Sequence, residues 1–100
     1  MRTRVNIGRQ VKEFIGGLAP APRRRVWTAL KQLPRGRGDV VALEGDLAPY
    51  WRLRAGKIRI VFEEKQSGGE RVLNCFFADY RATVYSALAT MIANDLLGEL

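Results

Sequence analysis

Several residue types are missing or scarce in this chain, and each absence excludes a class of site. The 100 residues include no histidine and one cysteine, Cys75. One cysteine cannot form an internal disulfide, and without histidine a zinc or redox centre is not expected. No apolar run approaches the roughly 20 residues of a membrane span, and the start, MRTRVNIGRQ, lacks the apolar segment of a signal peptide. We therefore expect a cytoplasmic protein with no metal, no cofactor and no membrane partner.

Acidic residues are scarce in the first third of the chain. Residues 1–37 hold ten lysines and arginines against a single acid, Glu13, and the whole chain carries a net charge of +7. Such a basic surface suits a polyanion such as nucleic acid, or an acidic protein, although it can also be a solvated face that aids solubility. The length and the 47% hydrophobic content predict one globular domain over residues 1–100.

Hydrophobic periodicity predicts an α+β fold. Weak alternation over residues 3–7 indicates a strand, and helical spacing over 11–18 and 26–33, on either side of a proline-rich bend, indicates a helical hairpin. Beyond residue 39 the apolar positions alternate, which predicts two strands within 50–62 and a third over about 71–78, with Cys75 as a buried apolar residue. Helical spacing returns near the C-terminus. We expect an N-terminal strand and helical hairpin packed on a small antiparallel sheet, with a C-terminal helix.

The stretch YWRLRAGKIRI, residues 50–60, predicts a hairpin that concentrates positive charge. If Ala55-Gly56 is the turn, Leu53, Ile58 and Ile60 point inward. The outward face then holds four cations: Arg52, Arg54, Lys57 and Arg59. Like charges directly opposite one another destabilise a strand pair by up to about 1 kcal/mol, which a bound anion would offset. No acid alternates with them on this face before Glu63, so we favour a phosphate-binding surface over a solvated hairpin.

Four short motifs follow one another in order along the chain. They are L-x-G at residues 43–45, W-R-L-R at 51–54, R-I-x-F at 59–62 and R-x-x-V-Y at 81–85. With the predicted order of elements, this set resembles the RelE/ParE superfamily of toxins from bacterial and archaeal toxin–antitoxin pairs. The resemblance implies a compact sheet with a helical hairpin on one side, and a cognate antitoxin that neutralises the toxin. It also implies that operator DNA is met only indirectly, through the complex with the antitoxin.

The two branches of that superfamily imply different activities. RelE-like members cut messenger RNA in the ribosomal A site, whereas ParE-like members inhibit DNA gyrase and need no nuclease chemistry. By position, Arg59 matches the RelE arginine near the scissile phosphate, and Arg81 and Tyr85 match a second arginine and a tyrosine near the C-terminus. Arg52 lies where RelE members carry a basic residue, but Tyr50 stands where they carry a lysine.

The chemistry that the RelE resemblance implies is metal-independent. RNA is cleaved when its own 2′-hydroxyl attacks the adjacent phosphate, which requires a base, an acid and stabilisation of the charged phosphorane. Arg52, Arg59 and Arg81 are expected to supply that stabilisation, because arginine stays protonated and is a poor base. Tyrosine can also stack on a nucleotide base. The titratable candidates for proton transfer are Lys57, Tyr85 and Glu63.

The remaining cations are expected to bind nucleic acid. Arg54 lies on the hairpin, and the second predicted helix carries the run Arg23, Arg24 and Arg25. The run is either a solvated helix face or a surface that binds ribosomal RNA with an affinity that falls as the salt concentration rises. We therefore expect a ribosome-dependent mRNA endoribonuclease that inhibits translation. The alternatives that stay open are a ParE-like gyrase inhibitor without nuclease activity and a non-catalytic nucleic-acid-binding module.

Overall fold

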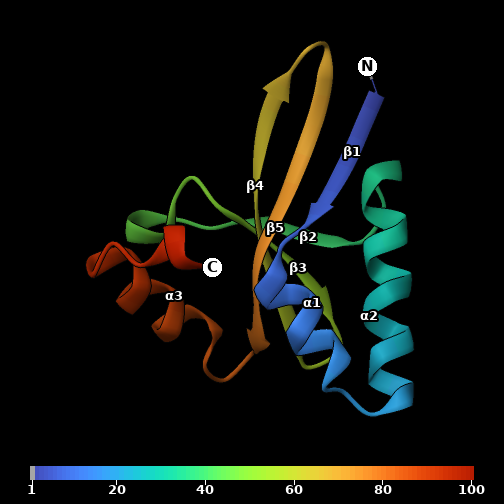
Figure 1. The fold of residues 1–100 in the computed structure, drawn as a ribbon, viewed down its shortest axis with the longest axis horizontal. Coiled ribbons are helices and arrows are strands. Elements are labelled where there is room, and N and C mark those ends of the chain that lie inside the picture. Colours follow the sequence, from blue (N-terminus) through green and yellow to red (C-terminus); the bar gives the residue numbers. More distant parts are fainter. Residues whose placement is uncertain (1) are drawn as a thin grey trace.

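The secondary structure follows the predicted order and contains one further strand. The computed structural model describes residues 2–100, so the first residue of the predicted domain lies outside the described part. Figure 1 shows the main elements: β1 (Arg2–Ile7), α1 (Arg9–Gly16), α2 (Pro20–Gln32), β2 (Asp39–Ala42), β3 (Trp51–Ala55), β4 (Ile58–Ser67), β5 (Glu70–Tyr80) and α3 (Val84–Ala93). Three short 3-10 turns complete the order: η1 (Leu33–Arg35), η2 (Gly45–Leu47) and η3 (Leu97–Glu99). No helix within residues 2–100 has the length and apolar composition needed to cross a membrane.

The strands form a mixed sheet in the order β1-β5-β4-β3-β2. Strands β2 to β5 are antiparallel neighbours, whereas β1 runs parallel to β5, with Val5 beside Leu73. Parallel strands need a long crossover, and here the helices α1 and α2 begin the connection that separates β1 from the other strands. The predicted α+β class is confirmed. The expectation of an antiparallel sheet is corrected at β1.

The strand that periodicity does not predict is β2, at the edge of the sheet. It has four residues, DVVA, and pairs antiparallel with β3, so that Asp39 lies opposite Arg54 and Ala42 opposite Trp51. Val40 packs against the core, but Val41 is 45% exposed. An edge strand this short, with one face open, shows too little alternation to be recognised from its sequence.

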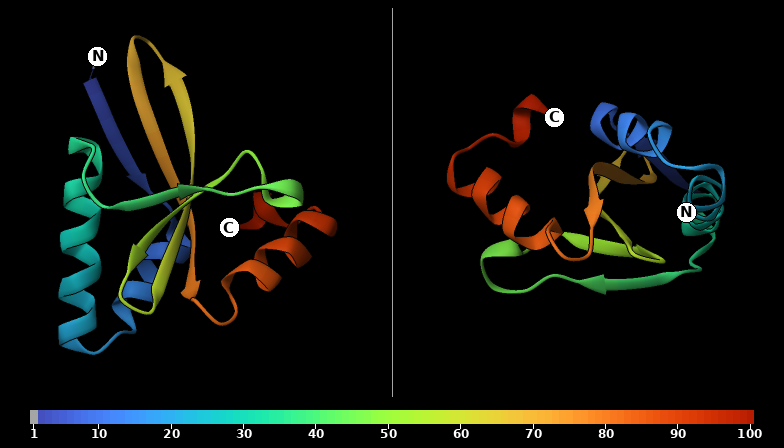
Figure 2. Two further views of the ribbon diagram at one scale, coloured as in Figure 1. Left: turned by 180° about the vertical axis from the view of Figure 1, so that it is seen from behind. Right: turned by 90° about the horizontal axis from the view of Figure 1, so that it is seen from below.

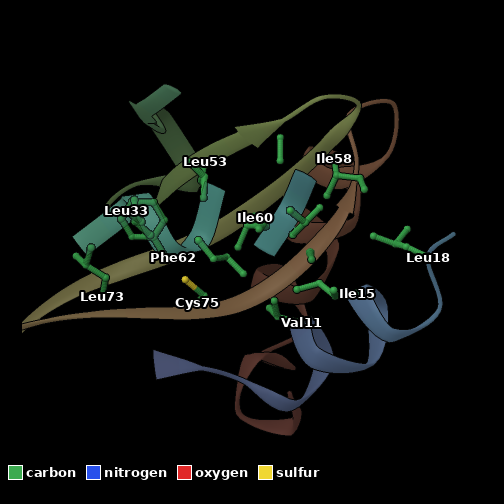
Figure 3. Close-up of a cluster of buried hydrophobic side chains, with 14 residues drawn as sticks. Val11, Ile15, Leu18, Leu33, Leu53, Ile58, Ile60, Phe62, Leu73 and Cys75 are labelled. Atoms are coloured by element: carbon green, nitrogen blue, oxygen red, sulfur yellow. The ribbon is translucent and has the colours of Figure 1, made fainter. Parts of the chain in front are cut away.

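Each face of the sheet has its own apolar cluster. Helices α1 and α2 cover one face, and α3 lies on the opposite side (Figures 1 and 2). On the first face, Val11 and Ile15 of α1 pack against strand residues that include Leu53, Ile60, Leu73 and Cys75 (Figure 3). Leu30 of α2 belongs to the same cluster. On the second face, the buried cluster consists of Val61, Phe77, Val84 and Leu88. We call this second side the α3 face.

The turn between β3 and β4 lies one residue further along than predicted. Arg54 pairs with Arg59, so Gly56 and Lys57 form the two-residue turn. Gly56 has φ +63°, in the left-handed region that glycine adopts most readily and that two-residue hairpin turns require. The predicted turn, Ala55-Gly56, is therefore wrong, and Lys57 leaves the strand.

The correction to the turn does not exchange the two faces of the hairpin. The pairing moves by two residues in total, and side chains repeat their face every second residue. Leu53 and Ile60, which now lie opposite each other, are both fully buried, and Ile58 is 3% exposed. The predicted inward set is confirmed.

The side chain of Gln10 in α1 continues the hydrogen bonding of β5 beyond the end of β1. The last paired residue of β1 is Ile7, beside Cys75, and Gly8 N–H donates to the Cys75 carbonyl at 2.8 Å. Beyond this point the Gln10 amide takes over: its Nε2 donates to the Ala78 carbonyl at 2.9 Å, and its Oε1 accepts from Ala78 N–H at 2.7 Å. These two bonds satisfy a backbone unit that β1 does not reach.

Cys75 is fully buried on the α1/α2 side, as predicted from the alternation of β5. Burial raises the pKa of its thiol from 9.0 to about 12, because a thiolate would be poorly solvated there. The thiol is therefore neutral at physiological pH and acts as a small apolar side chain.

Candidate functional site

A row of four charged residues crosses the sheet on the α3 face. Directly opposed residues in antiparallel strands share a face, and the pairings join one residue from each of β2, β3, β4 and β5. These residues, which we call the charged row, are Asp39, Arg54, Arg59 and Asp79. The next row across the same strands contains Val41, Arg52, Val61 and Phe77. Because Val61 and Phe77 belong to the cluster that packs against α3, both rows lie on the α3 face.

Asp39 partly neutralises the cations of β3. Its Oδ1 lies 3.1 Å from Nη1 of Arg52 and its Oδ2 lies 3.7 Å from Nη1 of Arg54. Arg52 also donates to the Asp39 carbonyl at 3.0 Å, and its side chain is only 17% exposed. The expectation that no acid precedes Glu63 on this face is therefore wrong, since β2 brings an acid beside the two arginines.

Arg59 holds the β3–β4 turn. Its Nη1 donates to the carbonyls of Gly56 at 2.8 Å and of Ile58 at 3.1 Å, and the side chain is half-buried. The residue opposite it in β5, Asp79, accepts from Tyr80 N–H at 2.8 Å and from the Thr83 hydroxyl at 2.9 Å. Arg59 thus orders the β3–β4 turn, and Asp79 orders the segment that links β5 to α3, in addition to the charge that each carries.

Arg81, in the segment that links β5 to α3, and Tyr85, at the start of α3, approach the same end of the sheet. Arg81 N–H donates to the Lys57 carbonyl at 2.8 Å, and its side chain is exposed. Tyr85 lies in the first turn of α3, half-buried against the cluster that includes Val61. Arg52, which is paired with Val61, shares that side of the sheet. The structure therefore brings four of the five residues predicted as catalytic to one end of the sheet, with Arg52, Arg59 and Tyr85 on the α3 face and Arg81 in the segment beside it.

Lys57 is the exception among these five residues. It lies in the turn, exposed, and does not extend from the strand face that carries the charged row. Glu63, the other candidate for proton transfer, is held by Asn74 Nδ2 at 3.1 Å and by Lys65 Nζ at 3.3 Å. It lies further along β4 than the charged row. Of the titratable candidates, Tyr85 is therefore the one that lies on the α3 face near the charged row.

The run Arg23-Arg24-Arg25 does not form one patch. Arg23 donates to the carbonyls of Leu18 at 2.8 Å and Gly16 at 3.3 Å, which fastens the loop between α1 and α2. Arg24 is exposed on α2. Arg25 lies across the β3–β4 turn, where a Cβ on Gly56 would meet its Nη1 at 2.7 Å. These three consecutive arginines therefore lie in different surroundings.

The arrangement suits an anionic ligand and contains no evident metal site. Arg52, Arg54 and Arg59 lie on one face of the sheet. Together they can bind the oxygens of a phosphate, because the planar guanidinium group matches phosphate geometry well. Among residues 2–100, no three side chains of His, Cys, Asp or Glu come together as ligands for a metal ion. The sequence analysis does not predict that Asp39 and Asp79 lie beside the arginines. Their position depends on the pairing of β2 and β5 with the hairpin, which local periodicity does not reveal.

Comparison with known proteins identifies the fold. No family model and no curated protein matches the chain. A chain of the archaeal RelE–RelB complex from Pyrococcus horikoshii is 26% identical with a TM-score of 0.58, and the match covers 81% of this chain and 97% of that chain. A chain of the RelB–RelE antitoxin–toxin complex from Methanococcus jannaschii is 15% identical with a TM-score of 0.57, covering 82% and 96%.

A bacterial structure matches equally well. The YoeB/ParE toxin from Agrobacterium tumefaciens is 22% identical with a TM-score of 0.60, and the match covers 81% of this chain and 99% of that chain. All three matches thus span nearly the whole length of the compared chains. By the fold that it shares with them, this protein belongs to the RelE/ParE-type toxin superfamily.

Proposed function

We propose that the protein is the toxin of a toxin–antitoxin pair and that it cleaves messenger RNA on the ribosome. The observation that carries this proposal is the gathering of Arg52, Arg54 and Arg59 on the α3 face, with Arg81 and Tyr85 at the same end of the sheet. Folding alone does not favour directly opposed arginines such as Arg54 and Arg59. A phosphate bound among them would relieve the repulsion.

The proposed reaction is internal attack on the phosphodiester. The 2′-hydroxyl gives up its proton, the O2′–P bond forms, and the P–O5′ bond breaks as the leaving oxygen takes a proton. The products are a 2′,3′-cyclic phosphate and a 5′-hydroxyl. Arg52, Arg59 and Arg81 stabilise the charge on the phosphorane oxygens, which is often the largest single contribution to catalysis. Tyr85 is the preferred group for proton transfer, since Lys57 lies in the turn.

The proposed partner is a cognate antitoxin. The structures from Pyrococcus horikoshii and Methanococcus jannaschii are RelE–RelB complexes, which supports a partner of this kind here. A protein with a net charge of +7 attracts an acidic segment. We infer that such a segment, or an amphipathic helix that uses the apolar surface of α3, covers part of the α3 face.

Single-turnover cleavage of mRNA on programmed ribosomes tests the proposal. Arg81→Ala should lower the cleavage rate by roughly 10²-fold or more, the scale for loss of one donor that stabilises the transition state. Arg59→Ala should do the same, but its stability must be measured alongside, because Arg59 also holds the turn. Arg35→Ala, which removes an exposed arginine from η1, is the matched control and should cleave normally. Full activity in folded Arg59→Ala and Arg81→Ala would refute the nuclease assignment.

Two further variants separate the candidates for proton transfer. Tyr85→Phe keeps the ring but removes the hydroxyl, so it should slow cleavage more than Lys57→Ala if Tyr85 moves a proton. If Tyr85 only stacks on a base, the phenylalanine variant should cleave at the wild-type rate.

One observation favours a ParE-like inhibitor of DNA gyrase as the second candidate. Asp39 and the turn carbonyls already engage Arg52 and Arg59, and an inhibitor that acts by contact needs neither a base nor an acid. A gyrase supercoiling assay with the purified protein distinguishes the two. Inhibition of gyrase without mRNA cleavage would select the ParE-like function, and neither activity would leave a nucleic-acid-binding module.

A further inference from the structure

A hollow of about 340 Å³ lies on the opposite side of the β3–β4 turn from the charged row. It is formed where the loop between α1 and α2, the start of α2, the turn and the end of β5 meet. We call it the turn hollow. The side chains that matter for its chemistry are Pro22, Arg25, Lys57, Ile58 and Tyr80.

Tyr80 gives the turn hollow an exposed aromatic wall. It is paired with Ile58, which is buried on the α1/α2 side, yet Tyr80 itself is 48% exposed. Phe14 of α1 packs against it edge-on, with the ring centroids 5.3 Å apart and the planes at 63°. Phe14 therefore orients the Tyr80 ring while much of that ring stays open to solvent. An exposed, oriented aromatic ring is the usual platform on which a single-stranded nucleotide base stacks.

Two cations from different elements border the same hollow. Lys57 comes from the turn, and Arg25 comes from α2 and crosses over Gly56. The close approach of Arg25 depends on the missing Cβ of Gly56, which would lie 2.7 Å from Nη1 and 3.2 Å from Cδ. No acidic residue lines the hollow within the described part of the chain. The hollow is thus positive and suited to a phosphate.

We propose that the turn hollow binds one nucleotide of single-stranded RNA, with its base on Tyr80 and its phosphate between Arg25 and Lys57. The choice of RNA as ligand rests on the proposed function. Continuity with the α3 face supports it: Arg59 Nη1 contacts the Gly56 carbonyl at 2.8 Å, and Arg81 N–H contacts the Lys57 carbonyl at 2.8 Å. An RNA strand bound along the charged row would need only to pass around the β3–β4 turn to reach the turn hollow. Lys57 then binds the substrate instead of moving a proton.

The test is binding of a short single-stranded RNA whose 2′-hydroxyls are methylated, so that it cannot be cleaved, measured by fluorescence anisotropy without ribosomes. Tyr80→Ala should weaken binding by about 5- to 150-fold, the range for loss of one stacked base, whereas Tyr80→Phe should bind normally. Arg25→Ala and Lys57→Ala should each lower the salt slope, d log K/d log[salt], by about 0.7 in magnitude. Trp27→Ala and Lys31→Ala remove an aromatic ring and a cation from α2 outside the hollow, so they serve as controls.

Each result of this experiment either supports or refutes RNA binding in the turn hollow. If Tyr80→Ala unfolds, Tyr80→Leu keeps an apolar contact with Phe14 but cannot stack, and it should show the same loss. The proposal fails if folded Tyr80→Ala or Tyr80→Leu binds RNA as tightly as Trp27→Ala does. It also fails if Tyr80 and Arg25 variants lose the antitoxin but keep RNA, because the hollow is then a protein-docking site. If the RNA binding behaves as expected but ribosomes show no mRNA cleavage, the nuclease function falls and the turn hollow stands.

Discussion

At the scale of single residues, Asp39 controls how much positive charge the α3 face offers to an anion. It contacts Arg52 at 3.1 Å and Arg54 at 3.7 Å, while its own side chain is 50% exposed. Ion pairs with this much solvent access contribute between zero and about 1 kcal/mol to stability. A phosphate can therefore displace the carboxylate, but it must compete with it. Asp39 is therefore a counterion already in place beside the two arginines.

Replacing Asp39 with alanine should tighten RNA binding. Arg52 and Arg54 lose their counterion, so each becomes free to neutralise a phosphate, and the salt slope should grow by up to about 1.4 in magnitude for the two together. Affinity for an uncleavable single-stranded RNA should rise several-fold at low salt. Asp46→Ala removes an exposed acid from η2 and gives the effect of net charge alone. Equal effects in both variants would show that Asp39 has no special relation to the two arginines.

At the scale of elements, the contact between α1 and β5 keeps the end of the sheet in order. Asp79, Tyr80 and Arg81 all follow the Ala78 unit that the side chain of Gln10 clamps. The clamp therefore fixes the last residues of β5 before the chain turns into α3. Residues of the charged row and of the turn hollow both depend on this segment.

Gln10→Ala should destabilise the protein by about 1–3 kcal/mol, since it leaves the buried N–H and carbonyl of Ala78 without their partner. Denaturant unfolding measures the loss, and the exchange of the Ala78 amide proton should accelerate more than that of amides in the centre of β5. Gln66→Ala, on the exposed part of β4, should change stability by less than about 0.5 kcal/mol. Unchanged Ala78 exchange in Gln10→Ala would mean that the clamp is not maintained in solution.

The elements show where sequence reasoning succeeds and where it stops. Alternation and hairpin pairing together predict that Arg52, Arg54, Lys57 and Arg59 share a face, and the structure confirms this for the three arginines but not for Lys57. Sequence reasoning misplaces the hairpin turn by one residue, since only the left-handed backbone of Gly56 selects between two possible turns. It misses β2, whose four residues are too few to show a period. Consequently, sequence reasoning does not predict that Asp39 lies beside the arginines. Nor does it predict that Arg25 lies across the turn at Gly56, because this contact joins segments some thirty positions apart.

At the scale of the whole molecule, charge and apolar surface point to the same kind of partner. The excess of cations lies in the first third of the chain, whereas the chain beyond it is slightly acidic. On the opposite side of the sheet from α1 and α2, α3 presents Met91 and Ile92 half-buried and Leu96 38% exposed beyond its end. An antitoxin with an acidic segment and an amphipathic helix would complement both features.

Expression of the protein alone should arrest bacterial growth, and co-expression of its cognate antitoxin should restore it. Folded Arg81→Ala is the matched control, because it should bind the antitoxin yet permit growth if cleavage causes the arrest. Growth curves with graded induction, together with co-purification of the two proteins, provide the measurement. A protein that does not slow growth at any level of induction would argue strongly against a toxin.

The parallel pairing of β1 with β5 determines when the sheet can assemble during synthesis. Residues 2–7 leave the ribosome first, but they pair with residues 70–75, so that Asn6 and its partner Asn74 are 68 positions apart. At about 5–20 residues per second, β1 waits roughly 3–14 s for its neighbour. A chain released before residue 70 has neither β5, which joins β1 to β4, nor α3. Incomplete products therefore cannot build the α3 face, which forms only once the chain has been synthesised through β5 and α3.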